Sequence, residues 1–366
     1  MESNTTASNN FLWSDVNWNA LRRLRERFLQ FDPRQRDAGP GTKDSSGEVA
    51  SPAGDPVAAP PDRADYWRSH SDLASYDFTF AERIGWKWDT VLAELTLRGW
   101  TPPEGAVLDW GCGTGVAGRR VAEAWPQQVH ALHFSDRSGP AHHFAAARAR
   151  AAFPELAVKS SPGADIAPDM LVLSHVLNEL TPDALERLLA LAEKAQAILW
   201  VEPGTLPVSR KLIAIRERLL SRFRVVAPCT HQAACGMLAP GNERHWCHHF
   251  ARVPGYVHTD PGWGRFAQTL EIDLSSVPFS FLVLDRRPAA QVGTPAAGSA
   301  EARVIGEPRH YKGFAKVLSC QADGVKELML QKRDAPELLK AMKKAPGSLY
   351  RWERDGEKIR AGEQIF

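Results

Sequence analysis

Hydrophobic and polar residues alternate along the central part of the chain with two different periods. Short apolar runs predict strands, and the segments between them repeat apolar residues every three to four positions, which predicts helices. Strands are expected over 106–110, 129–135, 170–174 and 198–202, and helices over 116–124, 141–152, 182–194 and 208–223. Strands that alternate with helices of this length predict an α/β fold, with a parallel sheet covered on both faces.

The segments on either side of this region have other patterns. Residues 12–30 have helical spacing with arginines between the apolar positions, which predicts an amphipathic helix. Residues 66–99 are dense in aromatic residues and helix formers, so helices are expected there as well. Three later runs, at 279–284, 303–305 and 314–319, look like strands with antiparallel connections. A β-rich C-terminal extension is therefore expected.

Composition divides the chain further. Two stretches, 33–64 and 287–302, are rich in small residues and poor in large apolar ones, so we expect flexible tethers. The expected divisions are an N-terminal helix (1–32), a tether (33–64), an α/β domain (65–224), a cysteine-bearing loop with a sheet strand (225–286), a tether (287–302) and C-terminal strands with a helix (303–366).

Overall composition excludes several classes of protein. With 43% hydrophobic and 24% charged residues, the 366-residue chain is not disordered throughout. No run approaches the ~18 apolar residues of a membrane span, and the polar N-terminus lacks a secretory signal. The odd number of cysteines, 5, argues against a disulfide framework. A cytoplasmic location is expected.

A glycine-rich turn follows the first predicted strand. Asp109 ends that strand, and Gly111, Gly113 and Gly115 stand at alternate positions before the next helix. Glycine suits a backbone that adopts positive φ and approaches a ligand closely. Asp136 stands at the end of the second strand, where an acidic side chain can accept hydrogen bonds from both hydroxyl groups of a ribose. A tight turn without a ligand is the alternative.

The spacing D-x-G-x-G-x-G differs from the dinucleotide fingerprint and resembles the first motif of class I S-adenosylmethionine (SAM)-dependent methyltransferases. The resemblance implies a Rossmann-like, mostly parallel sheet with helices on both faces. It also implies a SAM site, with ligand contacts at Asp109, Gly111, Gly113, Gly115 and Asp136. Residues near Asp165 and the pair 174–175 are further candidates.

The region after the strand at 170–174 lacks the Asn/Asp-Pro-Pro-aromatic element that amino-methylating members of this fold usually carry there. His175, Asn178 and Glu179 are the catalytic candidates in its place. Alternatively, Asn178 and Glu179 only lead into the next helix, with Thr181 as its cap and Pro182 at its first position.

Three of the 5 cysteines, Cys229, Cys235 and Cys247, are concentrated in one stretch rich in Gly, Pro and His. Thiolates on flexible loops are typical of metal sites, and Cys320 or a histidine would complete the set. Unconnected buried thiols are the alternative, and this is how we interpret Cys112. Spacing alone does not separate zinc from an iron–sulfur cluster.

The order of these features is similar to one family. The domain at 65–224 is followed by A-P-C-x5-C and W-C-H-x-F over 227–250, then by P-x3-K-G-x6-C over 308–320. This arrangement resembles the methyltransferase-like small-ribosomal-subunit assembly proteins of mitochondria and their bacterial relatives, over roughly residues 66–332. The resemblance implies a [4Fe–4S] cluster on Cys229, Cys235, Cys247 and Cys320. It also implies binding to small-subunit rRNA or a ribosome precursor, with no membrane or DNA partner.

Charge is distributed unevenly, which bears on an RNA partner. Residues 1–200 carry 20 basic and 26 acidic side chains, and residues 201–366 carry 25 and 17. A dense run over 210–224 supplies candidate phosphate contacts: Arg210, Lys211, Arg216, Arg218, Arg222 and Arg224. Lys312, Lys316, Lys332 and Arg333 would extend these contacts into a continuous track. A solvated helix face is the alternative.

Two functions of different classes remain. The first is a SAM-dependent methyltransferase that acts on small-subunit rRNA and carries a metal centre. The second is a non-catalytic assembly factor that retains the methyltransferase fold, which the missing Asn-Pro-Pro-aromatic element favours. A zinc-containing methyltransferase with another substrate is a further alternative. The sequence does not decide whether a methyl group is transferred.

Overall fold

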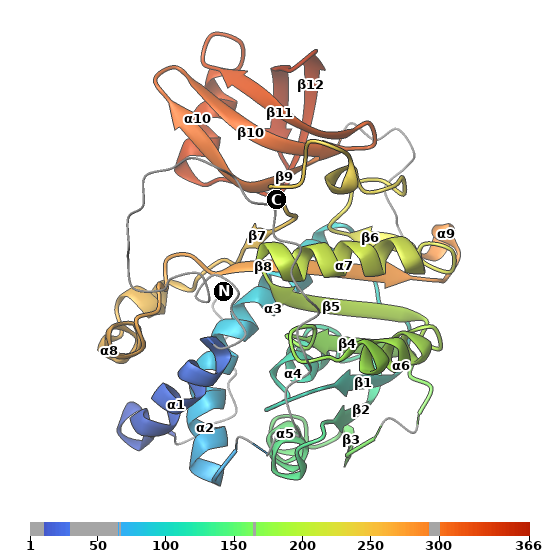
Figure 1. Cartoon of the computed structure of the whole chain (residues 1–366), viewed down its shortest axis with the longest axis vertical. Coiled ribbons are helices and arrows are strands. Elements are labelled where there is room, and N and C mark those ends of the chain that lie inside the picture. Colours follow the sequence, from blue (N-terminus) through green and yellow to red (C-terminus); the bar gives the residue numbers. More distant parts are fainter. Residues whose placement is uncertain (1–10, 30–64, 66, 164–165, 293–300) are drawn as a thin grey trace, which may run out of the picture.

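The computed structural model describes residues 11–29, 65, 67–163, 166–292 and 301–366 (Figure 1). The tether predicted over 33–64 lies outside these residues, as does Asp165. The tether predicted over 287–302 is wrong at both ends, because a short helix, α9 (Ala289–Val292), and the start of a strand occupy them. The physical reason for the helix is burial, since Val292 is fully covered in the main hydrophobic core.

The N-terminal region is helical: η1 (Trp13–Asp15), α1 (Trp18–Leu29), α2 (His70–Phe78) and α3 (Phe80–Leu97). The single helix predicted over 12–30 is interrupted at Asn17, whose side chain accepts a hydrogen bond from the N–H of Ala20 at 3.0 Å. Asn17 thereby satisfies a free N–H in the first turn of α1. The Trp13 indole donates to Asp260 at 3.0 Å, which joins this segment to α8 (Pro261–Leu270).

The central sheet contains β1 (Gly105–Trp110), β2 (Val129–Ser135), β3 (Ala157–Ser161), β4 (Met170–Ser174), β5 (Ala197–Pro203), β6 (Arg224–Ala227), β7 (His249–Phe250) and β8 (Pro278–Asp285). Its order is β3-β2-β1-β4-β5-β8-β6, with β7 paired to β8. Strands β1 to β5 are parallel, and β8 is antiparallel to both β5 and β6. This order, with one reversed strand near the edge, is that of class I methyltransferases. The predicted fold class is confirmed.

Helices cover both faces of the sheet (Figure 1). Successive strand residues point to opposite faces, so Val107 packs with α3, α4 (Val116–Ala124) and α5 (Gly139–Ala152). Leu108 packs on the other face, with α6 (Pro182–Ala192) and α7 (Leu206–Leu219). Both faces are buried, which explains why the strands are continuous apolar runs.

The C-terminal region is a separate small barrel. Its elements are β9 (Glu301–Tyr311), β10 (Phe314–Gln321), β11 (Gly324–Gln331), α10 (Pro336–Lys344), β12 (Leu349–Asp355) and β13 (Lys358–Gln364). The strands close in the order β10-β11-β13-β12-β9, around a core that includes Val317, Leu330 and Trp352. The predicted β-rich extension is therefore present, with a helix within 303–366 as expected, although the closure of its strands into a barrel was not predicted.

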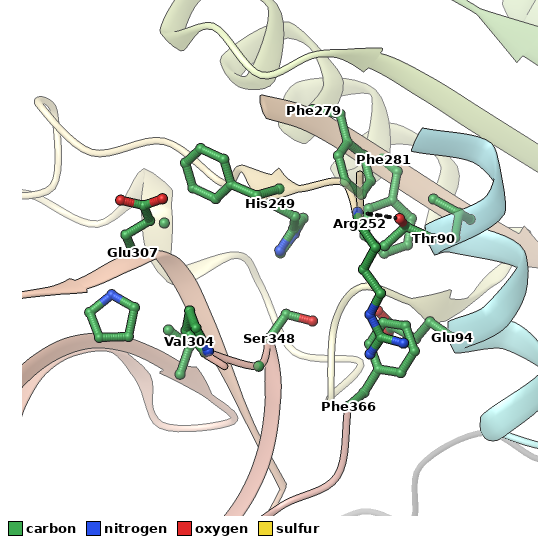
Figure 2. Close-up of a pocket in the computed structure, with 16 residues that line it drawn as sticks. Thr90, Glu94, His249, Arg252, Phe279, Phe281, Val304, Glu307, Ser348 and Phe366 are labelled. Carbon is green, nitrogen blue, oxygen red and sulfur yellow. Dashed lines mark hydrogen bonds between the residues drawn. The ribbon is translucent and has the colours of Figure 1, made fainter. Parts of the chain in front are cut away.

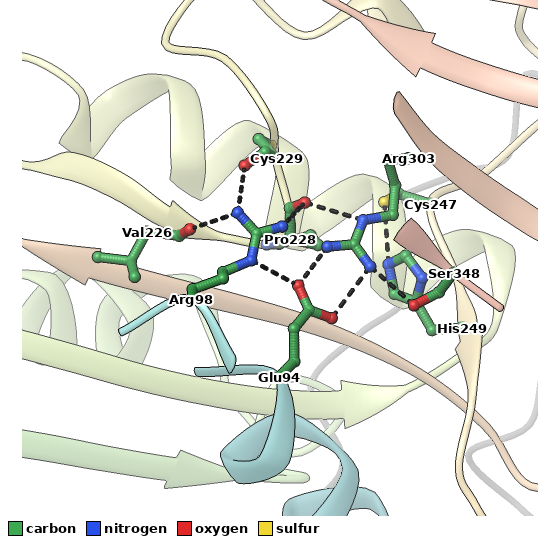
Figure 3. A network of polar contacts seen from close by, with 9 residues as sticks. All are labelled: Glu94, Arg98, Val226, Pro228, Cys229, Cys247, His249, Arg303 and Ser348. Carbon is green, nitrogen blue, oxygen red and sulfur yellow. Dashed lines mark hydrogen bonds and ion pairs between the residues drawn. The ribbon is translucent and has the colours of Figure 1, made fainter. Parts of the chain in front are cut away.

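A buried ionic network joins the barrel to the methyltransferase-like domain (Figure 3). Glu94 of α3 accepts hydrogen bonds from Arg98 at 2.9 Å and from Arg303 of β9 at 3.0 Å. Both guanidinium groups also donate to the carbonyl of Pro228, at 3.2 Å from Arg98 and 2.9 Å from Arg303. Arg303 donates further to the Ser348 hydroxyl at 2.9 Å. One carboxylate thus holds together α3, the loop before Cys229 and the barrel.

Removal of the Glu94 charge should destabilise the fold. Burial alone would raise the pKa of Glu94, but Arg303 and Arg98 hold it below its usual range. We expect Glu94→Gln to lose about 3–5 kcal/mol of unfolding free energy, because two buried guanidinium groups lose their counter-charge. Urea denaturation measures this loss, with Glu337→Gln as the control, because the Glu337 side chain is 86% exposed.

The unfolding free energy lost in Glu94→Gln should decrease as pH falls. A carboxylate with a lowered folded pKa stabilises the fold above its unfolded pKa, and this contribution disappears as pH falls through the folded value. The difference between wild type and Glu94→Gln should therefore be constant between about pH 6 and 8 and shrink in acid. A difference below about 1 kcal/mol at neutral pH would contradict the role given to this network.

Candidate functional site

The glycine turn stands at the carboxyl edge of β1. Its glycines adopt positive φ, with 53° at Gly113 and 79° at Gly115. A Cβ on Gly115 would lie 2.7 Å from Phe134, so glycine lets α4 pack closely on the sheet. Nothing lies within 4 Å of the corresponding Cβ position at Gly113, which leaves that side of the turn open. The N–H of Gly111 donates to the carbonyl of Ser135 at 2.7 Å and ties the turn to β2.

Asp109 is fully buried beneath this turn. One carboxylate oxygen accepts the N–H of Gly118 in the first turn of α4 at 2.8 Å. The other oxygen, Oδ1, is buried without a hydrogen-bond partner among the described residues. Burial raises the pKa of Asp109 to about 7, against the opposing effects of the Gly118 N–H and of Arg119. A buried carboxylate oxygen without a donor is an unusual feature and suits a ligand that brings one.

Asp136 lies beside the same turn. Its two oxygens accept backbone N–H groups, from Gly113 at 2.9 Å and from Ser138 at 2.8 Å. Burial raises the pKa of this carboxyl, although these two hydrogen bonds oppose the shift. The structure therefore brings together all five predicted ligand contacts, because Asp136 bonds directly to the glycine turn. The carboxyl edge of parallel strands is also where such sheets bind ligands.

His175 follows β4 with a φ of 59°, which is uncommon for a residue other than glycine. Its Nε2 lies 2.9 Å from the Lys87 ammonium, and its Nδ1 lies 3.3 Å from the Ser174 hydroxyl. Burial lowers the pKa of His175 well below its usual range, and the Lys87 and Arg83 charges lower it further. Burial also lowers the pKa of Lys87 to about 7. Lys87 was not among the predicted residues, since an isolated lysine in an aromatic-rich helix carries no signal.

Glu202 is a second residue that the sequence did not indicate. It is fully buried, and one oxygen accepts the N–H groups of Val176 and Leu177 at 3.0 and 3.2 Å and the Trp200 indole at 2.7 Å. The other oxygen has no partner among the described residues, and burial raises the pKa of Glu202 to about 7. Glu202 therefore fixes the backbone immediately after His175.

The other two catalytic candidates lie in the turn that follows. Asn178 and Glu179 are half-buried and precede α6. Thr181 is the cap of that helix, accepting the N–H of Ala184 at 3.3 Å, and Pro182 begins it, as the structural alternative predicted. A capping role for Thr181 does not exclude chemistry at Asn178 or Glu179, which remains a prediction.

The four predicted metal ligands come from distant parts of the chain. Cys235 and Cys247 pack with Cys320 of β10 in one hydrophobic cluster that also contains Ile213 of α7. Burial raises the pKa of the Cys247 thiol far above its usual range, and the charges of Cys229, Cys235 and Cys320 raise it further. All four side chains are thus close enough to affect one another, and all four are free thiols.

The sulfur atoms do not surround a single point. In the part of the chain that the structure describes, no group of three His, Cys, Asp or Glu side chains is arranged to hold a metal ion. Two thiols have histidine neighbours instead, with Cys320 3.6 Å from His231 and Cys247 3.7 Å from His249. A metal centre on these residues is therefore a proposal and not an observation.

The basic run over 210–224 does not form the predicted continuous track. Arg210 turns inward and donates to the carbonyls of Met237 and His245, both at 2.6 Å. Arg216 is buried and donates to the carbonyl of Ala233 at 2.8 Å. These two predicted RNA contacts are wrong, because their guanidinium groups hold the cysteine loops. Exposed positions remain at Lys211, Arg218, Arg222 and Arg224.

A pocket lies elsewhere, between the sheet and the barrel (Figure 2). It is lined by His249 and Phe279 from the sheet and by Val304 and Ser348 from the barrel. The Arg252 guanidinium lies 4.0 Å from the ring centre of Phe366 inside it. None of the predicted SAM contacts lines this pocket, so it is separate from the glycine turn.

Comparison with known protein families identifies the family to which this chain belongs. The family described as mitochondrial small ribosomal subunit Rsm22 matches residues 89–355. The chain belongs to the Rsm22 family. The predicted resemblance to methyltransferase-like small-subunit proteins is thereby confirmed. No curated protein sequence matches the chain.

Several solved structures are weakly similar to this Rsm22-family chain. Magnesium protoporphyrin IX methyltransferase of Synechocystis PCC 6803 with bound SAH has 15% identity and a TM-score of 0.35, covering 72% of this chain and 98% of its own. The plantazolicin methyltransferase BpumL with SAH has 15% identity and a TM-score of 0.33, covering 59% and 89%. YjhP of E. coli has 14% identity and a TM-score of 0.33, covering 55% and 92%. Likenesses this distant do not identify a reaction.

The Rsm22 family description also bears on location. It names the mitochondrial small subunit, so the predicted cytoplasmic location is not confirmed. Among the residues that the structure describes, no helix is long and apolar enough to cross a membrane.

The buried carboxyl of Asp109 should make the stability of the protein depend on pH, which tests this description of the site. Its folded pKa of about 7 lies above the usual aspartate value of 3.8, so its contribution to stability is lost as pH rises through about 7. We expect the unfolding free energy of wild type to fall relative to that of Asp109→Asn by roughly 1–3 kcal/mol between pH 5 and 8. Thermal or urea unfolding at both pH values measures the change. The exposed control Glu104→Gln should show no such trend, and a pH-independent Asp109→Asn difference would contradict the buried-acid assignment.

Proposed function

We propose that this chain is a SAM-binding protein that carries a [4Fe–4S] cluster on four cysteines and acts with small-subunit rRNA or a ribosome precursor. Membership of the Rsm22 family supports the ribosomal partner. The observation that carries the proposal is that Cys235, Cys247 and Cys320 pack in one cluster, near enough to Cys229 for the four thiols to affect one another, in a chain that also has a methyltransferase-type glycine turn.

The glycine turn fits SAM chemically. The buried Oδ1 of Asp109 lacks a donor, and the ammonium group of SAM would provide one. The open side of Gly113 leaves room for a ligand against the backbone. Asp136, next to that glycine, is the acid that would accept the ribose hydroxyl groups.

Four cysteines can hold a [4Fe–4S] cluster or a single zinc ion, and the family resemblance favours the cluster. Zinc holds its sulfur ligands about 2.3 Å away, so four thiolates around it nearly touch. A cubane is wider and keeps its thiolates further apart, so the two centres require different sulfur–sulfur separations. Arg216 lies near Cys229 and Cys235, and Arg303 lies near Cys247 and Cys320, so positive charge would offset the thiolates.

Such a cluster would act as a structural crosslink. Its ligands would connect the loop after β6, the loop before β7 and strand β10 of the barrel. Binding free energy at a site that exists only in the folded chain stabilises the fold. The cluster would then hold the barrel on the sheet, together with the Glu94 network.

Metal analysis tests the cluster. Protein purified without air should absorb broadly in the visible and contain about four iron and four sulfide per chain. Cys320→Ala should lose most of both and melt at lower temperature, because one strand is no longer linked. Cys112→Ala removes a buried thiol outside the set and should retain them. Colourless protein with zinc, or Cys320→Ala with wild-type iron, would overturn the assignment.

Methyl transfer to RNA is the second candidate function. The observation that favours it is Lys87 beside His175 after β4, with a Lys87 pKa of about 7. An acceptor nitrogen would attack the methyl carbon of SAM, forming the N–C bond as the C–S bond breaks and its electron pair passes to sulfur. The proton of the acceptor would pass to a neutral base, which a lysine with this pKa can supply.

SAM binding tests the glycine turn directly. Calorimetry should detect binding to wild type and about tenfold weaker binding to Asp109→Asn, because the ammonium group loses a charged acceptor. Glu104→Gln should bind like wild type. Equal affinity of Asp109→Asn and wild type would remove SAM from the proposal. If SAM binds, transfer of labelled methyl to small-subunit rRNA, lost in Lys87→Met, separates an enzyme from a non-catalytic factor.

A further inference from the structure

The barrel has the topology of a nucleic-acid-binding fold. Strands β9, β10 and β11 form an antiparallel meander, β11 is parallel to β13, and β12 pairs with β9 to close the barrel. Helix α10 lies between the third and fourth strands. This order is that of the OB-fold, whose second and third strands and neighbouring turns bind oligonucleotides or oligosaccharides.

The turn between β9 and β10 carries a stacked aromatic pair. Tyr311 and Phe314 close a two-residue turn, with ring centres 4.7 Å apart and ring planes at 10°. Tyr311 is 49% exposed, whereas most large aromatic side chains of the described barrel are buried. An exposed ring already held parallel to a neighbour is a platform on which a nucleic-acid base can stack.

Positive charge surrounds this pair. The hairpins over 309–333 contain six basic and two acidic side chains. Lys312 lies in the turn itself, and the carbonyl of Gly313 accepts the N–H of Lys332 at 2.9 Å, which brings Lys332 and Arg333 to the same end of the barrel. All three cations are exposed, and no carboxylate in the described chain pairs with Lys312 or Lys332.

The neighbouring sheet face is continuous with this end. Lys316 and Arg309 share one carboxylate, Glu327, so two positive charges face a single negative charge and the group keeps a net positive charge. Lys316 is opposite Met329 in the β10–β11 ladder, and the N–H of Met329 donates to the backbone carbonyl of Glu357 in the β12–β13 turn at 2.8 Å. The face thus extends from the aromatic pair to the second turn that OB-folds use.

We propose that this face binds a single-stranded segment of RNA, with a base stacked on Tyr311 and phosphates on Lys312, Lys332 and Arg333. The RNA partner rests on the proposed function, and the surface and the single-stranded class go beyond it. An excess of cations favours a polyanion over a neutral oligosaccharide. Stacking needs unpaired bases, so single strands are preferred over duplex.

The test uses the full chain and a labelled oligouridine RNA of about ten nucleotides, a length within the range that one OB-fold covers. Wild type should bind it more tightly than an RNA duplex of equal length. Tyr311→Ala should weaken binding about tenfold, and Tyr311→Phe, which keeps the ring, should bind like wild type. Lys332→Ala should weaken binding and reduce the slope of log affinity against log salt by about 0.7.

Lys194→Ala removes an exposed charge from the methyltransferase-like domain and should change neither the affinity nor the salt slope. Melting temperatures confirm that each variant is folded. If wild type binds small-subunit rRNA and Tyr311→Ala binds it equally well, the barrel face is not the RNA-binding surface, while the proposed function stands. If wild type binds neither rRNA nor oligouridine, the RNA partner fails altogether. Loss of a protein partner in Tyr311→Ala with unchanged RNA binding would identify a protein-docking surface and also overturn the inference.

Discussion

One buried carboxylate determines how the two halves of this protein meet. Glu94 lies at the end of α3 and receives Arg98 from its own helix and Arg303 from the barrel. Both arginines also hold the carbonyl of Pro228, directly before Cys229. Buried charges are tolerated only when they are paired and hydrogen-bonded, so barrel, cysteine loop and helix must adopt their positions together.

The Glu94 network couples the position of the candidate metal centre to that of the proposed RNA surface. Cys320 is on β10, the strand that also begins at the exposed aromatic turn. Cys235 and Cys247 lie in loops held by Arg210, a residue that sequence alone suggested for RNA. A cluster on these thiols would therefore fix the orientation of the barrel relative to the sheet, and with it the surface that we propose for RNA.

The SAM site depends on a different constraint. At the carboxyl edge of β1, β4 and β5, Asp109 and Glu202 are buried acids, each with one unpartnered oxygen. Glu202 holds the backbone after His175, and Asp109 holds the first turn of α4. Two raised pKa values in one region are typical of functional sites, where desolvation is tolerated because a ligand or a proton completes the interaction.

Much of the α/β domain could be predicted from the sequence, because local periodicity determines helices and buried strands and the D-x-G-x-G-x-G spacing imposes a turn with positive φ. The short strand β3 was missed, since its half-buried residues lack an apolar run. Only the tertiary structure decided that Arg210 and Arg216 turn inward, that Lys87 reaches His175 and that β9 to β13 close into a barrel. These features depend on partners far apart in the chain, and a side chain's direction relative to such partners leaves no local pattern.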